Sequence, residues 1–129
     1  MKLFNKQYSQ PGTKPGTISQ SDVVNYTVSL IDYNKTDIED HTVLELATCR
    51  DFIANTNVTW IHVQGNPSAE AMITLAKGLN IHELHIEDIL NNGQRPKVEL
   101  NEDQIFIILN LPLSDKGVTK IEQVSLFIT

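Results

Sequence analysis

The twenty residues from Ile81 to Leu100, IHELHIEDILNNGQRPKVEL, constrain the fold more than any other part of the chain. Successive side chains step round an α-helix by about 100°, so a helix in this stretch has two different faces. The apolar face holds Ile86, Ile89 and Leu90. The opposite face holds Glu87, Asp88 and Asn91. We therefore expect a short helix that packs one face on a sheet and points its acidic face at water or at something that brings positive charge.

The end of this helix is marked by Asn91-Asn92-Gly93, because Asn and Gly tolerate the left-handed conformation that closes a helix. We expect strands at Lys97–Leu100 and Gln104–Leu111, joined by a hairpin turn. The second of these should end at Pro112, since proline cannot donate to a strand ladder. A last strand is expected at Glu122–Ile128.

Upstream, residues 1–21 are rich in Ser, Gln, Pro and Gly and cannot bury enough apolar surface to offset chain entropy, so we expect a flexible arm. Residues 22–129 are expected to form one domain. Its first half is predicted to contain a strand at Val23–Tyr33, a polar turn at Asn34–Thr42, a helix at Val43–Phe52, and a strand at Val58–Val63 that is mostly buried on both faces.

A second helix is expected next, with Asn66 as its cap and Pro67 at its first position. Its core-facing stripe is predicted to be Ala69, Met72, Ile73, Ala76 and Leu79. Asn80 is expected to begin the acidic helix, because Glu83 follows three residues later in a capping-box position.

Length and charge limit what such a chain can do. At 129 residues and 14.5 kDa it is long enough for a single core. With 16 acidic and 10 basic residues the formal charge is −6, which disfavours a nucleic-acid surface and favours a cation as partner. Cys49 is the sole cysteine, so we expect it to be buried rather than part of a disulfide or metal site. No apolar run approaches the roughly 20 residues of a membrane helix, and the first ten residues lack a signal-peptide core.

The adjacent carboxylates of Glu87 and Asp88, with Asn91 one turn on as a candidate third ligand, supply oxygens that suit Mg²⁺ or Ca²⁺. Two carboxylates on one helix cannot surround an ion, so such a site would be weak and completed by water or another chain. The alternative, an ordinary solvated helix face, stays open. His82 and His85 could serve zinc only with a third ligand, and we expect His82 to close the helix start instead.

Catalytic motifs are missing from the sequence: it contains no glycine-rich phosphate loop and no nucleophile elbow. We therefore expect no enzyme. Arg95 and Lys97 could grip an anion, but ion pairs with neighbouring acids are the simpler expectation for an Arg-Pro-Lys segment.

Several segments of the chain together form a recognisable set. The most specific is the acidic pair followed by Gln94, Arg95, Pro96, Lys97 and Glu99. The others are Trp60-Ile61, Gly78 to His82, Glu87 to Asn91, Ile105 to Ile107, and Glu122 to Leu126. These segments resemble the amino-terminal cytosolic domain of the CorA family of magnesium transporters, and the resemblance covers Val58 to Thr129, 72 of the 129 residues.

The resemblance implies an α/β (α+β) fold in which a mixed parallel and antiparallel sheet lies between layers of helices. It also implies a cytosolic regulatory domain of a pentameric Mg²⁺ or Co²⁺ channel at the cell membrane. The long stalk helix and the transmembrane helices of that family are expected to lie outside this sequence. In the family, residues matching Glu87 and Asp88 face an acidic residue of the neighbouring subunit, and regulatory Mg²⁺ binds weakly between them.

The sequence leaves two alternatives open. The domain could belong to the zinc-transporting branch of the family, in which the acidic site need not act as a Mg²⁺ gate. It could also be a free-standing binding domain. The Mg²⁺-sensing interpretation would fail if internal Arg or Lys partners locked Glu87 and Asp88, or if both turned into the interior.

Overall fold

The computed structural model describes residues 25–42, 45–115 and 117–129. Contacts divide the chain into two units, residues 18–86 and residues 87–129 with 1–17. The predicted arm, residues 1–21, lies outside the described residues. The expectation of one domain over 22–129 stays a prediction.

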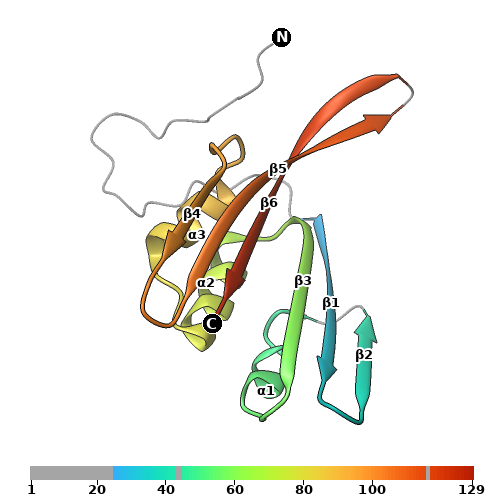
Figure 1. The fold of residues 1–129 in the computed structure, drawn as a ribbon, viewed down its shortest axis with the longest axis vertical. Coiled ribbons are helices and arrows are strands. Elements are labelled where there is room, and N and C mark those ends of the chain that lie inside the picture. Colours follow the sequence, from blue (N-terminus) through green and yellow to red (C-terminus); the bar gives the residue numbers. More distant parts are fainter. Residues whose placement is uncertain (1–24, 43–44, 116) are drawn as a thin grey trace. The chain divides into compact units, whose positions relative to one another are not determined.

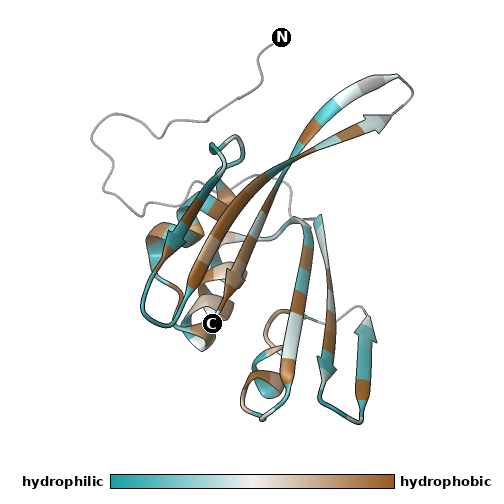
Figure 2. Cartoon of the chain, in the orientation of Figure 1, coloured by the Kyte–Doolittle hydropathy of each residue, from teal (hydrophilic) through white to brown (hydrophobic). Residues whose placement is uncertain are grey.

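A three-stranded antiparallel sheet forms the first unit, with β1 (Asn25–Tyr33) between β2 (Ile38–Thr42) and β3 (Val58–Asn66) (Figure 1). Val28 and Leu30 point to the same face of β1 and are buried. Figure 2 shows apolar and polar residues alternating along β3, and Trp60 on this strand is 55% exposed. The strand at 58–63 is therefore confirmed, but the prediction that both of its faces are mostly buried is wrong.

The polar segment Asn34–Thr42, predicted as a turn, contains the edge strand β2. The turn occupies only its first residues, where Asn34 Oδ1 accepts hydrogen bonds from the amides of Thr36 and Asp37. This local closure reverses the chain and brings Ile38 opposite Tyr33. An edge strand needs few apolar side chains, which is why the sequence IEDHT gives no strand pattern.

Asp32 anchors the loop that precedes β3. Its buried carboxylate accepts hydrogen bonds from Asn57 Nδ2, Asn55 Nδ2 and the Thr59 hydroxyl at 2.7, 2.9 and 2.7 Å. The hydrogen bonds from Asn57 and Thr59 hold the pKa of Asp32 below its ordinary value, although burial acts in the opposite direction. The charged form of Asp32 is thus a structural element of the first unit.

The helices of the first unit differ from the expected boundaries. The helix predicted at Val43–Phe52 is limited to α1 (Arg50–Ile53), and two residues of that range, 43–44, are not described. Cys49, just before α1, is fully buried, and burial raises the pKa of its thiol, as expected for a packing residue.

The helix α2 (Ala69–Leu79) begins two residues later than predicted. Ser68 is its N-cap, because its hydroxyl accepts a hydrogen bond from the Ala71 amide at 3.1 Å; Asn66 belongs to β3. Asn80 ends this helix in the left-handed conformation instead of starting the next one. The buried residues of α2 are Met72, Leu75 and Ala76.

The acidic helix is α3 (Glu83–Leu90), and the boundary between the two units falls within it. The expected capping box is wrong, since His82 takes that role: its Nδ1 accepts a hydrogen bond from the Leu84 amide at 3.2 Å. The predicted stop is confirmed, because α3 ends at Leu90 and Gly93 adopts a φ of 93°.

A second antiparallel sheet forms the other unit, with β5 (Ile105–Asp115) between β4 (Lys97–Leu100) and β6 (Val118–Ile128) (Figure 1). Phe106 and Ile108 are completely buried, and Figure 2 shows the apolar stretch at the start of β5. Contrary to prediction, β5 continues through Pro112. It can do so because β4 pairs only with residues 105–108, so the side of Pro112 away from β6 faces no paired strand.

The predicted α+β class is confirmed. The expectation of mixed pairing requires correction, because both sheets of the described residues are antiparallel throughout. Short turns connect β1 to β2 and β4 to β5, and such connections reverse the chain direction. Within the described ranges, no helix is long and apolar enough to span a membrane.

Candidate functional site

The acidic pair lies in the last turn of α3, and both of its residues are half-buried. The helical wheel predicts that the face holding Asp88 points at water or at a positive charge. The structure places the Asp88 side chain, which is 24% exposed, against the positively charged first residue of β4. The turn between α3 and β4 spans only residues 91–96, so the strand returns alongside the end of the helix.

Lys97, the first residue of β4, holds its ammonium group between two carboxylates. Its Nζ lies 2.6 Å from Asp88 Oδ2 and 2.5 Å from Glu99 Oε1, and it donates a hydrogen bond to each. Lys97 and Glu99 are two residues apart on one strand and therefore share a face. Asp88 thus has an internal lysine partner of the kind that weakens the sensing interpretation.

Electrostatics and packing both fix the position of this ammonium group. Burial by itself lowers the pKa of Lys97, but the hydrogen bonds and charges of Asp88 and Glu99 outweigh it and raise the pKa above its ordinary value. Nζ also lies 5.3 Å from the centroid of the Phe106 ring, within cation–π range. Lys97 is therefore charged at neutral pH, and the cluster of Asp88, Lys97 and Glu99 has a net charge of about −1.

Gln123, on β6, fixes the backbone of the same segment. Its Oε1 accepts hydrogen bonds from the amides of Gly93 and Gln94 at 3.1 and 2.9 Å, and its Nε2 donates to the Asp88 carbonyl at 3.1 Å. The Gln123 side chain therefore provides hydrogen-bond partners for backbone groups of both the helix end and the following turn. Asp88 is held at its main chain by Gln123 and at its side chain by Lys97.

The residues of the Gln-Arg-Pro-Lys-Val-Glu segment are placed in two groups. Gln94 is buried, and Lys97 and Glu99 form the ion-pair cluster, whereas Arg95 and Pro96 are exposed. Ion pairing of the segment with a neighbouring acid, the simpler expectation, is confirmed for Lys97. Gln123 is the residue that sequence reasoning missed. It lies in a segment of family resemblance, but nothing in its own pattern indicates that it contacts a helix 35 residues away.

The donor chemistry at the end of α3 suits Mg²⁺, although the described ligand set is incomplete. Carboxylate oxygens are the ligands that Mg²⁺ prefers. Across the described parts of the chain, however, no three His, Cys, Asp or Glu side chains gather as a metal site would require. Asn91, the candidate third ligand, has a buried Oδ1 that accepts no hydrogen bond from any described residue. A cation at Asp88 Oδ2 must also displace Lys97.

The histidine pair offers no better metal site. The ring centroids of His82 and His85 are 6.4 Å apart in an edge-on arrangement, and Nδ1 of His82 is used as a helix cap. His85 is buried. The expectation that His82 closes the helix start is confirmed.

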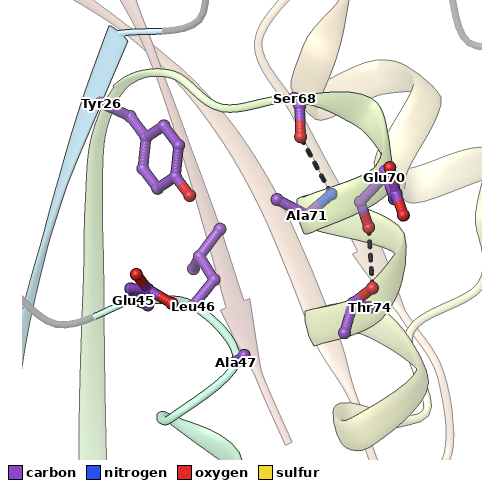
Figure 3. Close-up of a pocket in the computed structure, with 8 residues that line it drawn as sticks. All are labelled: Tyr26, Glu45, Leu46, Ala47, Ser68, Glu70, Ala71 and Thr74. Carbon is purple, nitrogen blue, oxygen red and sulfur yellow. Dashed lines mark hydrogen bonds between the residues drawn. The ribbon is translucent and has the colours of Figure 1, made fainter.

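A cleft of about 230 Å³ lies in the first unit (Figure 3). Tyr26 of β1, residues 45–47 and the start of α2 line it, and Figure 3 shows Tyr26 and Leu46 projecting into the same space. Its two drawn hydrogen bonds, Ala71 to Ser68 and Thr74 to Glu70, are internal to the start of α2. These two hydrogen bonds stabilise the start of α2, which lines the cleft, but they do not gather polar side chains from different elements around a common point. The end of α3 therefore remains the candidate site.

Two comparisons relate this chain to known proteins. The family model described as CorA-like Mg²⁺ transporter protein matches residues 55–129, which include α3, Lys97 and Gln123. The cobalt/magnesium transport protein CorA of Thermotoga maritima is 29% identical over 125 residues, which cover 94% of this chain and 36% of the relative. The chain thus spans about a third of the length of the curated relative that it matches.

Proposed function

The chain belongs to the family of CorA-like Mg²⁺ transporter proteins, and on that premise we propose that it is a cytosolic regulatory domain of a divalent-cation channel. In this proposal Glu87 and Asp88 bind regulatory Mg²⁺, and the channel is a homopentamer in the cell membrane. The transported ion is Mg²⁺, with Co²⁺ as a second substrate, in line with the printed name of the relative.

Charge supplies the physical basis of the proposed switch. Two unit negative charges about 4 Å apart repel by roughly 1 kcal/mol in water and by about 4 kcal/mol near a protein surface. A divalent cation between the acidic pair and an acidic residue of a neighbouring subunit reverses that repulsion and favours the closed ring. When cytosolic Mg²⁺ falls, the ion leaves and the subunits separate, so the population shifts toward the open channel.

The observation that supports the proposal is the fixed main chain of Asp88 within the region that matches the family. Gln123 donates a hydrogen bond to the Asp88 carbonyl at one end of a short helix, whereas Lys97 pairs with the Asp88 carboxylate and has to be displaced by the ion. A sensor needs carboxylates whose position changes little when the ion leaves, because flexible ligands would weaken the coupling to subunit movement. Direct contacts from one chain are few, so low affinity is expected, with waters completing the coordination of Mg²⁺.

The test is inhibition by internal Mg²⁺ in a complete transporter that carries this domain. We expect Glu87→Gln with Asp88→Asn to let cation flux persist at Mg²⁺ concentrations that close the unmodified channel. The matched control is Glu102→Gln with Asp103→Asn, which alters an adjacent acidic pair that is exposed in the β4–β5 turn. Unchanged inhibition in the first variant rejects the proposal, and loss of inhibition in the control shows that general charge is responsible.

A further inference from the structure

The position of Lys97 suggests a role beyond stabilising the fold. Its ammonium group is fixed by Asp88 Oδ2 on the helix and by Glu99 Oε1 on the strand, and both carboxylates are partly accessible, with side chains 24% and 43% exposed. A positive charge therefore already occupies the place at Asp88 that a regulatory cation would take. The carboxylates of Asp88 and Glu99 make the potential at this position negative, and the single positive charge of Lys97 offsets one of their two negative charges.

We propose that Lys97 is an internal competitor of Mg²⁺ at Asp88 and thereby sets the Mg²⁺ concentration at which the domain responds. This inference rests on the proposed function of the acidic pair. Without Mg²⁺, the lysine satisfies Asp88. When Mg²⁺ binds, it takes the place of the ammonium group beside Asp88 Oδ2 and Glu99 Oε1, and the ammonium group moves into water.

The geometry permits this exchange without rebuilding the site. Both carboxylate oxygens lie within 2.6 Å of one nitrogen atom. They are therefore at most about 5 Å apart, so a divalent cation with oxygen ligands at about 2.1–2.5 Å needs only a small side-chain shift to contact both once the ammonium group is removed. The hydrogen bonds from Gln123 hold the Asp88 carbonyl and the amides of Gly93 and Gln94 independently of Lys97. Exchange of the cation can therefore occur while α3 keeps its end in place.

Competition also changes the energetics of the ion-free state. Without Lys97, an empty site would leave two carboxylates facing each other, and their repulsion would favour any available cation. With Lys97 present, the empty state is already partly neutralised, so Mg²⁺ must replace an existing ion pair. The response is consequently shifted to higher Mg²⁺ concentrations, and the lysine also discriminates against monovalent cations, which carry no more charge than it does.

The direct test is calorimetric titration of the 129-residue chain with MgCl₂. Lys97→Met removes the charge and keeps an aliphatic stem of similar length. We expect it to bind Mg²⁺ about tenfold more tightly than the unmodified chain, since up to two partly exposed ion pairs no longer have to be broken. Lys97→Arg keeps the charge and should resemble the unmodified chain. Lys77→Met, at an exposed position of α2, controls for the change in net charge.

If Lys97→Met binds Mg²⁺ no more tightly than Lys97→Arg, including the case in which neither binds, the competition is refuted. Lys97→Gln keeps a hydrogen-bond donor for the two carboxylates, and it replaces Lys97→Met if circular dichroism shows that the methionine variant does not fold. Tighter binding must also disappear when Asp88→Asn is combined with the lysine substitution.

Inhibition of the complete transporter separates this inference from the proposed function. A lower inhibitory Mg²⁺ concentration in Lys97→Met, with inhibition lost in the Glu87 and Asp88 double variant, supports both. If the double variant loses inhibition but Lys97→Met responds at the original concentration, the acidic pair senses Mg²⁺ and the competition is wrong. If the double variant keeps inhibition while the lysine variant of the chain gains affinity, the competition stands and the regulatory role fails.

Discussion

Replacing Gln123 by alanine tests whether one side chain of β6 holds the acidic segment in place. The substitution removes two acceptor contacts, from the amides of Gly93 and Gln94, and one donor contact, to the carbonyl of Asp88. A typical intramolecular hydrogen bond contributes about 0.5–1.5 kcal/mol, and a buried polar group left without a partner costs about 1–3 kcal/mol. These contacts are part-buried, so we expect a loss of about 2–4 kcal/mol in the free energy of unfolding of this unit.

Amide hydrogen exchange followed by NMR gives the most local measurement. We expect the amides of Gly93 and Gln94 to exchange at least about tenfold faster in Gln123→Ala, because about 1.4 kcal/mol corresponds to a factor of ten. The control is Gln64→Ala, which removes an exposed glutamine from β3. Unchanged exchange at both amides, with the fold intact, would refute the assignment of Gln123 as the residue that holds this turn.

The glutamate variant separates the two kinds of contact. Gln123→Glu keeps an oxygen that accepts from both amides but loses the donor to the Asp88 carbonyl and places a negative charge against that oxygen. Protection of the Gly93 and Gln94 amides should therefore be largely retained, while the last turn of α3 becomes less stable. Equal loss of protection in the alanine and glutamate variants would contradict this division.

Three further predictions concern stability. The pKa of Asp32 is lowered in the folded state, so ionised Asp32 stabilises the fold fully above its unfolded pKa near 4, and this stabilisation is lost as the pH falls through the lower folded pKa. The urea midpoints of the wild type and of Asp32→Asn should therefore converge below the folded pKa. A constant difference between the two midpoints down to pH 2 would contradict this. Phe106→Ala should cost about 3–5 kcal/mol in urea unfolding, since the ring is completely buried, and a cost below 1 kcal/mol would disprove close packing there. Gly65→Ala should lower the midpoint of thermal unfolding far more than Gly117→Ala. Both positions have positive φ, but an added Cβ lies 2.3 Å from the Asn25 carbonyl oxygen at Gly65 and meets nothing within 4 Å at Gly117. Equal effects of the two substitutions would contradict the close approach of Gly65 to Asn25.

The sequence predicts elements well where several local signals agree. The strand at Lys97–Leu100 and the end of the acidic helix at Leu90 both follow directly from turn residues beside apolar runs. The strand at 38–42 is missed because an edge strand of mostly polar residues has no apolar alternation. Pro112 is misread for a related reason, since only the pairing of β5 shows that β4 ends opposite Ile108 and leaves one side of Pro112 without a paired strand.

The candidate site is less predictable than the elements that carry it. Residue types identify Glu87 and Asp88 as oxygen ligands, and the family resemblance adds a role for them. The partner of Asp88 depends on how β4 returns beside α3, and the contact with Gln123 depends on sheet register across 35 residues. Neither distance is fixed by local sequence. Helical periodicity predicts an acidic face turned to water or to a positive charge, and only the structure shows that this charge is Lys97 of the same chain in a half-buried cluster.

The most direct measurement is the location of a divalent cation in the assembled transporter. Mn²⁺ also prefers oxygen ligands and can be found by its anomalous scattering in crystals grown at a concentration that inhibits the channel. The account predicts an anomalous peak beside Glu87 and Asp88, in contact with a carboxylate oxygen or joined to it through water, with Lys97 displaced from Asp88. Peaks elsewhere in the assembly, together with an intact Lys97–Asp88 ion pair and no ion at the end of α3, would contradict it.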